Sequence, residues 1–148
     1  MPTAQQFCTF FLGDQVFGVP VSQVQEVIRF QPMTPVPLAS AVIEGKINLR
    51  GQIVIAIDLR RRLGLGARAS SDLPMNVVLR SAAGAVSLLV DQIGDVVEVG
   101  ENSFEPAPRT VSAEMREMLL GVYKLQGQLL HVLDGEKVCQ VRIETSTV

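Results

Sequence analysis

Short apolar segments alternate with turn-forming residues along most of the chain. Phe7–Leu12 and Val16–Val21 flank Gly13-Asp14-Gln15, and glycine in such a connection supplies the backbone freedom that a hairpin turn requires. Asn76–Ser81 and Ala85–Val90 repeat this arrangement around a second glycine-containing turn. Many short strands joined by turns and short helices are typical of small antiparallel barrels, so the pattern predicts a mainly β chain.

Further strands are predicted in both halves of the chain. Ile47–Leu49 and Gln52–Ile57 are separated by the tight connection Arg50-Gly51. Val96–Val99 and Gln128–Leu133 also have strand composition. Strand candidates are thus spread over the first and the second half alike.

Local capping signals predict the helices. Ser22 and Gln25 form a Ser-x-x-Gln capping box, which predicts a short helix over Gln23–Ile28. Asp58 is suited to cap a helical turn over Leu59–Leu63. Pro32, Pro35 and Pro37 lie between these two segments and predict an extended loop, because proline lacks a backbone donor and restricts the residue before it.

A further helix is predicted to begin after Ser112 and to end at Gly121. Met115, Met118 and Leu119 share one face of it, and this spacing indicates a core-facing stripe, with a partner-binding face as the alternative. The loop before this helix, Ser103–Pro108, is stiffened by proline.

An internal repeat relates the two halves. Gly45–Asp58 returns as Gly121–Asp134, 76 positions later, and Leu12–Val27 lines up with Ser81–Val96 at an offset of 69. The identical pairs of the first match are Gly45/Gly121, Leu49/Leu125, Gly51/Gly127, Gln52/Gln128 and Asp58/Asp134. The offsets differ by seven residues, which two copies of one small unit with a modest insertion explain.

The repeat predicts two lobes within a single domain. The first lobe would span about residues 6–66 and the second about 75–138, joined by a linker over about 64–74 and followed by a polar tail, 139–148, with no long terminal helix. Halves of this size can each bury only a small core, so two barrels that share an apolar interface are expected.

Composition narrows the class of protein. The 148 residues are 47% hydrophobic and 19% charged, as in an ordered globular domain, and the formal net charge is −2. A nucleic-acid-binding surface normally shows a basic excess, so no nucleic acid is expected as a partner. The apolar runs are far shorter than the ~20 residues of a membrane span, and the N-terminus lacks a secretory signal pattern, so a cytoplasmic protein without membrane insertion is predicted.

Candidate catalytic and cofactor chemistry is sparse. Cys8 and Cys139 lie at opposite ends of the chain and form no metal or redox motif, so buried reduced thiols are expected. His131, the only histidine, sits inside a strand without a nucleophile motif and is interpreted as structural. Gly64-Leu65-Gly66 lacks the following helix that a dinucleotide finger requires. No catalytic residue, metal site or cofactor is therefore predicted.

Two groups of charged residues are candidates for binding. Arg60-Arg61-Arg62, with Arg68 nearby, is interpreted as a solvated face, with an acidic protein partner or an RNA as alternatives. Glu26 and Arg50 are the more informative charges, because a guanidinium at a turn is suited to hold a carboxylate in a bidentate fashion. An ordinary surface arginine is the alternative for Arg50.

Together these segments resemble a known family. The motifs FxLGxxxFGVPVSQVQEV, GKINLRGQIVIAIDLRRRLG, LLVDQIGDVVEV and GVYKLQGQLLHVLD, with the proline loop after the first, are similar to the CheW family of chemotaxis coupling proteins over about Phe7–Asp134. The resemblance implies two SH3-like five-stranded β-barrel lobes packed on a shared hydrophobic core, with a few short helices. It also implies a non-enzymatic adaptor without cofactors, in bacterial chemotaxis signal transduction.

The resemblance implies partners and site residues as well. The partners would be the cytoplasmic tip of a methyl-accepting chemotaxis receptor and the regulatory domain of a CheA-type histidine kinase, at membrane receptor arrays. The receptor-binding residues carried over are Val24, Glu26, Gly45, Arg50 and Val96, with Glu26 and Arg50 as an ion pair, and the kinase-binding residue is Ile53. Thr110 departs from the aromatic residue that related couplers can carry for a second kinase contact. The alternative is a CheW-like scaffold of a non-flagellar receptor-kinase pathway.

Overall fold

The computed structural model describes residues 5–66, 73–82, 84–100 and 104–141, whose strands form two sheets. The strands are β1 Gln5–Leu12, β2 Gln15–Pro20, β3 Val24–Ile28, β4 Ile43–Leu49, β5 Gln52–Asp58, β6 Met75–Ser81, β7 Gly84–Val90, β8 Gln92–Val99, β9 Phe104–Glu105, β10 Leu119–Leu125 and β11 Gln128–Leu133. The helices are η1 Val21–Gln23, α1 Leu59–Arg62, α2 Ala113–Glu117 and α3 Gly135–Cys139. None of the described helices is long and apolar enough to cross a membrane.

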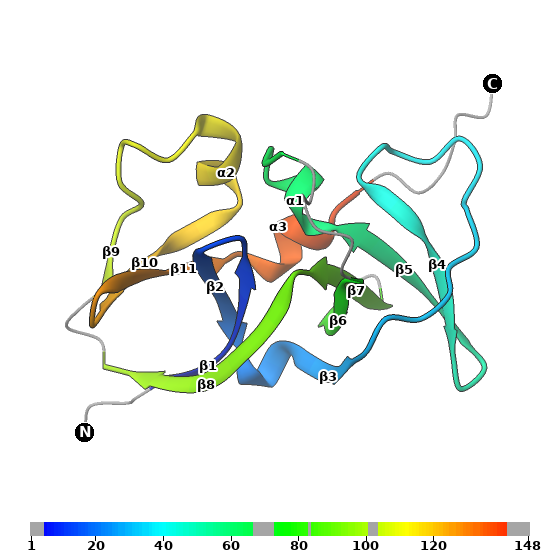
Figure 1. The fold of residues 1–148 in the computed structure, drawn as a ribbon, viewed down its shortest axis with the longest axis horizontal. Helices are drawn as coiled ribbons and strands as arrows, with labels where there is room; N and C mark the ends of the chain where they lie inside the picture. The colour runs from blue at the N-terminus through cyan, green and yellow to red at the C-terminus, as the bar shows by residue number, and fades with distance from the viewer. Residues whose placement is uncertain (1–4, 67–72, 83, 101–103, 142–148) are drawn as a thin grey trace.

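The two sheets form two SH3-like lobes that lie beside each other, which confirms the mainly β fold (Figure 1). One sheet has the order β8-β1-β2-β11-β10-β9 and the other β3-β6-β7-β5-β4. The first has six strands where five were expected, because the two-residue β9 pairs with β10. We call the six-stranded and five-stranded units lobe A and lobe B.

Each lobe combines strands from both halves of the chain. β1 and β2 lie in lobe A, while β3, β4 and β5 lie in lobe B; in the second half, β6 and β7 lie in lobe B and β8 to β11 in lobe A. The sheets are therefore not the contiguous stretches, about 6–66 and 75–138, that the sequence predicted. Of the expected linker and tail, residues 67–72 and 142–148 lie outside the described part.

The repeat is reproduced in the register of strand pairing. In lobe A, β2 and β11 are parallel and Phe17 pairs with His131; in lobe B, β7 and β5 are parallel and Val86 pairs with Ile55. These pairs correspond through the offsets of 69, from Phe17 to Val86, and 76, from Ile55 to His131. With β9 set aside, the two sheets have the same strand order. Each sheet takes the hairpin β1–β2 or β6–β7 from one half of the chain and its other strands from the other half, so these two hairpins have exchanged lobes.

The largest hydrophobic cluster lies between the lobes and takes side chains from both. Lobe A contributes Phe10, Phe17 and Leu133, and lobe B contributes Val77 and Leu88, all buried. Each lobe also has a smaller core of its own. The core of lobe A includes Phe7, Val16, Tyr123 and Leu130, and that of lobe B consists of Ile47, Leu49, Val54 and Val78. The expected shared core is present.

Helix capping was predicted correctly at Asp58 and Ser112. Asp58 accepts a hydrogen bond from the Arg61 amide, and Ser112 from the Met115 amide. Asp134, the repeat counterpart of Asp58, caps the short helix α3 in the same way. A side-chain acceptor satisfies one of the free amides at a helix start, which explains why these three helices begin where they do.

The predicted helix over Gln23–Ile28 is wrong. A single 3₁₀ turn ends at Gln23 without a side-chain cap, and Val24–Ile28 pairs with β6 as an edge strand. Pairing across the sheet here prevails over a local capping signal. The helix after Ser112 ends at Glu117, and Gly121 lies in β10, where a side chain would collide with Phe104.

Because strands of the two halves interleave, the protein should unfold as one unit. We expect Leu88→Ala in lobe B and Leu133→Ala in lobe A, both fully buried in the shared core, each to lower the free energy of unfolding by about 2–5 kcal/mol. Urea unfolding followed by far-ultraviolet circular dichroism and by Tyr123 fluorescence should give one coincident transition for each variant.

Leu120→Ala, at an exposed position, is the control and should change stability by less than about 0.5 kcal/mol. Two transitions, each sensitive to only one of the core substitutions, would contradict the interleaved core.

Candidate functional site

Glu26 and Arg50 form an ion pair. The Nη2 of Arg50 donates to Oε2 of Glu26, and Gln25 Nε2 donates to the same oxygen at 3.3 Å. Glu26 lies on β3 and Arg50 follows β4, the two opposite edges of the lobe B sheet. The ion pair therefore joins the edges of this sheet and closes the lobe.

The pair is exposed but electrostatically coupled. The Arg50 side chain is 68% exposed and that of Glu26 is 22% exposed. The hydrogen bond from Arg50, with a smaller contribution from Gln25, holds the pKa of the Glu26 carboxyl below its usual value. The same hydrogen bond raises the pKa of Arg50. Both groups are charged at neutral pH.

The backbone at Arg50 is unusual. Arg50 has φ of 50° and Gly51 has φ of 89°, and two successive residues with positive φ are typical of the type I′ hairpin turn. The Gly51 amide donates to Oδ1 of Asn48 at 2.8 Å, which ties the turn to the end of β4. This backbone directs the Arg50 side chain toward β3.

The other expected receptor-binding residues are distributed over both lobes. Val24 lies on β3, is half-buried against the shared core, and its carbonyl accepts from Arg80 at 2.9 Å. Val96 is 56% exposed on β8, in lobe A. The structure thus brings Glu26 and Arg50 into contact, places Val24 on the strand of Glu26, and puts Val96 on β8 in the other lobe.

Gly45 is buried rather than exposed. It lies in β4, and a Cβ there would stand 2.9 Å from the Thr34 carbonyl oxygen and 3.0 Å from the Met33 Cβ. Thr34 forms an isolated bridge with Lys46, so the proline loop crosses the edge of the sheet at this point. Gly45 allows that close approach, and a larger residue would push the loop outward.

Ile53 lines an apolar groove. Its side chain is 56% exposed on β5, at the edge of a hollow of about 730 Å³. The other lining residues come from β5, the β6–β7 hairpin and α3, and are Gln52, Ile55, Ser81, Ala82, Gly84, Ala85, Val86, Glu136, Cys139, Gln140 and Val141. A carboxylate oxygen of Glu136 accepts from the Ala82 amide at 3.2 Å, which ties α3 to the hairpin.

A second hollow, of about 580 Å³, is the repeat counterpart of the first. Gln128, Leu129 and His131 line it at the places that Gln52, Ile53 and Ile55 take in the first groove. Gln15, Val16, Gly64 and Leu65 correspond to Gly84, Ala85, Gln140 and Val141. The segment around α2, with Thr110, adds a further wall that the first groove lacks.

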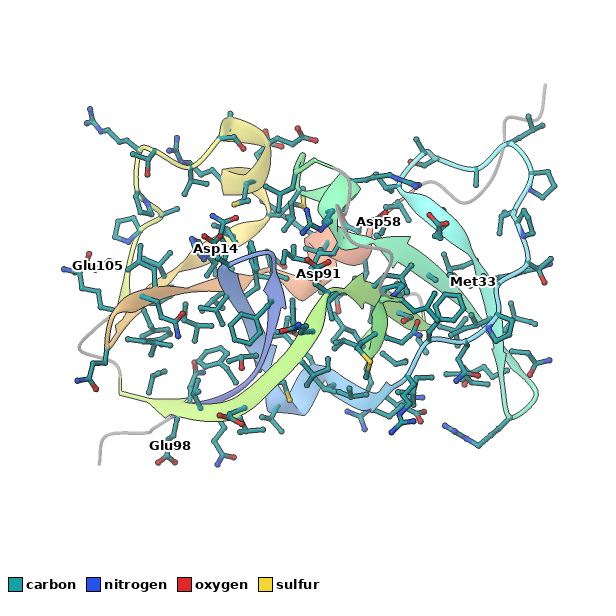
Figure 2. The ribbon with its side chains drawn as sticks, in the orientation of Figure 1. Asp14, Met33, Asp58, Asp91, Glu98 and Glu105 are labelled. Atoms are coloured by element: carbon teal, nitrogen blue, oxygen red, sulfur yellow. The ribbon has the colours of Figure 1, made fainter. Side chains whose placement is uncertain are left out.

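The interpretation of the arginine run as a solvated face is wrong for Arg60 and Arg62, whereas the Arg61 side chain is 50% exposed. Arg60 binds Asp91 through Nε and Nη2, at 3.1 and 2.5 Å, and Asp91 also accepts from the Gly13 amide at 2.7 Å. Arg61 pairs with Glu44. Figure 2 shows Asp91 between the two lobes, where β7 passes into β8.

Arg62 links α1 to the end of α3. Its guanidinium donates to the carbonyls of Lys137, Val138 and Gln140 at the end of α3. The RNA alternative rested on this run and loses its support. Arg68 lies outside the described residues.

His131, Cys8 and Cys139, the residues considered for catalysis or redox chemistry, have the following surroundings. His131 is buried, with Nδ1 2.9 Å from the Val16 carbonyl oxygen and its ring 5.0 Å from that of Phe17. Burial, with the nearby Glu136 carboxylate, raises the pKa of Cys139 to about 12, and burial raises that of Cys8. Within the described ranges, no cluster of His, Cys, Asp or Glu could hold a metal ion.

Comparison with known proteins gives a consistent result. The family model described as CheW-like domain matches residues 6–142. The chemotaxis protein CheW of Rhizobium meliloti is 31% identical over 134 residues, covering 90% of this chain and 86% of the relative. That of Bacillus subtilis is 29% identical, covering 99% and 94%. The crystal structure of scaffolding protein TtCheW from Thermoanaerobacter tengcongensis superimposes with a TM-score of 0.84 at 28% identity, covering 98% of this chain and 94% of that one.

The lowered pKa of Glu26 gives a direct test of the ion pair. Stability contributed by this carboxylate is present above its unfolded pKa and is lost as the pH falls through the lower, folded pKa. We expect the pKa of Glu26, measured by NMR of its side-chain carboxyl carbon, to lie below the ordinary value of a glutamate carboxyl in the wild type and to rise in Arg50→Gln. Gln126→Ala, at the repeat counterpart of Arg50, should leave this pKa unchanged. An identical pKa of Glu26 in wild type and Arg50→Gln would disprove the pairing in solution.

Proposed function

The chain belongs to the CheW family of chemotaxis coupling proteins, and on this basis we propose that it is an adaptor between the cytoplasmic tips of chemoreceptors and the regulatory domain of a CheA-type histidine kinase. The observation that carries the proposal is the Glu26–Arg50 ion pair, which stands exposed at the corner of lobe B, beside the Ile53 groove. In this role the protein performs no chemistry and signals through its contacts. It would be cytoplasmic and recruited to receptor arrays.

We assign receptor binding to the surface around Glu26 and Arg50. Of the three guanidinium nitrogens of Arg50, only Nη2 has a hydrogen-bond acceptor among the described residues. The other donors of this guanidinium are therefore available to a carboxylate of a receptor helix. Val27, beside Glu26, is 38% exposed and adds an apolar contact on the same edge strand. Val24 and Val96 extend the surface along β3 and β8, whereas Gly45 acts by holding the proline loop in place.

We assign kinase binding to the Ile53 groove. Its lining is mostly aliphatic or small, and an exposed isoleucine in a concave apolar surface is suited to anchor a protein partner, with affinity supplied by buried aliphatic area. The second hollow has the same framework, but α2 narrows it and Thr110 stands at its rim. The Ile53 groove is therefore the primary kinase contact in this proposal.

Arg50→Ala tests the receptor assignment. Loss of the guanidinium removes the ion pair and its remaining donors, so binding to a receptor-tip fragment, measured by calorimetric titration, should weaken by about tenfold or more. Gln126→Ala removes a polar side chain from the corresponding turn of lobe A and should bind like the wild type. Equal receptor affinity in Arg50→Ala and the wild type would refute the assignment.

Ile53→Asp tests the kinase assignment. A charge in the apolar groove should weaken binding of the kinase regulatory domain by about tenfold or more, while binding of the receptor-tip fragment stays within about twofold. Leu120→Asp is the matched control, because Leu120 has the same exposed fraction of 56% and lines neither groove. If both substitutions weakened kinase binding equally, a general loss of solubility or stability would explain the result, and the groove would not be the docking site.

A further inference from the structure

The two hairpin turns that correspond in the repeat have different backbones. Arg50-Gly51 and Gln126-Gly127 each connect two strands in the same register, since Leu49 pairs with Gln52 and Leu125 with Gln128. Arg50 has positive φ, whereas Gln126 does not, and the following glycine has positive φ in both turns. One strand register thus accommodates both turns, and the left-handed conformation of Arg50 is not required by the hairpin.

Side chains account for the difference. A left-handed conformation costs a residue with a Cβ roughly 1–2 kcal/mol, so it needs compensating contacts. Arg50 has two: its own ion pair with Glu26, and the bond from the Gly51 amide to Asn48. In the second half Asn48 is replaced by Lys124, which cannot accept a hydrogen bond and instead pairs with Glu105 at 3.1 Å.

The turn is placed between the two proposed binding surfaces. Arg50 belongs to the receptor surface, and Gln52 and Ile53, two and three residues later, line the kinase groove. Type I′ turns match the right-handed twist of a hairpin, whereas a turn with negative φ at the first position splays the strands. A change of the Arg50 backbone would therefore move the start of β5, and with it Ile53.

We propose that the β4–β5 turn is a two-state switch: a left-handed Arg50 state held by Glu26, and a released state with the backbone of the Gln126 turn. A receptor carboxylate that draws the guanidinium away from Glu26 favours the released state and thereby reshapes the kinase groove. This inference rests on the proposed function for the identity of the two ligands. The existence of the two turn states does not depend on it.

Two substitutions at one position separate the states. Arg50→Gln gives the turn the residue found in the second half and removes the ion pair with Glu26, so residue 50 should adopt negative φ. Arg50→Gly also removes the ion pair, but glycine tolerates positive φ without strain, so this variant should keep the left-handed turn. Both variants lose the guanidinium, so any difference between them reports the backbone alone.

The experiment combines NMR with calorimetry. The φ-dependent amide coupling of residue 50 and the methyl resonances of Ile53 report the turn and the groove in the free protein, and titration reports affinity for the kinase regulatory domain. We expect Arg50→Gln to show negative φ, a shifted Ile53 resonance and about fivefold or more weaker kinase binding, and Arg50→Gly to stay within about twofold of the wild type. Gln126→Ala should match the wild type in every readout.

Positive φ in Arg50→Gln, or an unchanged Ile53 resonance in that variant, would overturn the switch. Equal kinase affinity in Arg50→Gln and Arg50→Gly would overturn it as well, because the backbone state would then not reach the groove. If wild type binds no kinase domain, the proposed function fails, and the coupling and the methyl resonance still decide whether the turn has two states that alter the groove.

Discussion

The exchange of strands between the two halves is the constraint on which the structure depends. Neither sheet is complete without strands from both halves, and the shared cluster around Phe10, Phe17 and Leu88 fills the space between them. Arg60 and Asp91 reinforce this junction, since Asp91 lies where the chain crosses from lobe B to lobe A and also holds the β1–β2 turn. The grooves and the ion pair are thus carried on one framework of interleaved strands.

The receptor-binding residues that we propose lie where the two copies of the repeat differ. The framework is nearly identical, down to the parallel pairs and the capping aspartates, yet Arg50 has Gln126 as its counterpart and Glu26 has Asp95. The helices after β5 and β11 differ similarly: Glu136 binds the Ala82 amide directly, whereas Arg60, its counterpart, reaches the Gly13 amide through Asp91. An exposed ion pair contributes little to stability, which is consistent with a role for Glu26 and Arg50 in binding and shape.

The sequence predicted those features that depend on near neighbours. The hairpin turns, the caps at Asp58 and Ser112 and the Glu26–Arg50 pair were all anticipated, the last through family resemblance. The strand Val24–Ile28 was missed because its partner β6 lies about fifty residues away and no local signal reveals that pairing. The repeat showed which strands are equivalent but not which copy supplies each one, since both arrangements satisfy the same pattern. The ion pair between Arg60 and Asp91 was not predicted, because the two residues come together only when the lobes assemble.

The exchanged strands also suggest how such a molecule could arise. Each half contains a full set of five strands. Two identical half-length chains would therefore build the same pair of sheets with two-fold symmetry, if each chain placed its first hairpin in the sheet of the other. Such an ancestor would have carried two equal corners and two equal grooves. Once the two copies are joined in a single chain, each can change independently of the other. One turn can then have an arginine, Arg50, where the other has Gln126. In such an origin, the difference between Arg50 and Gln126 would have arisen after the two copies were joined.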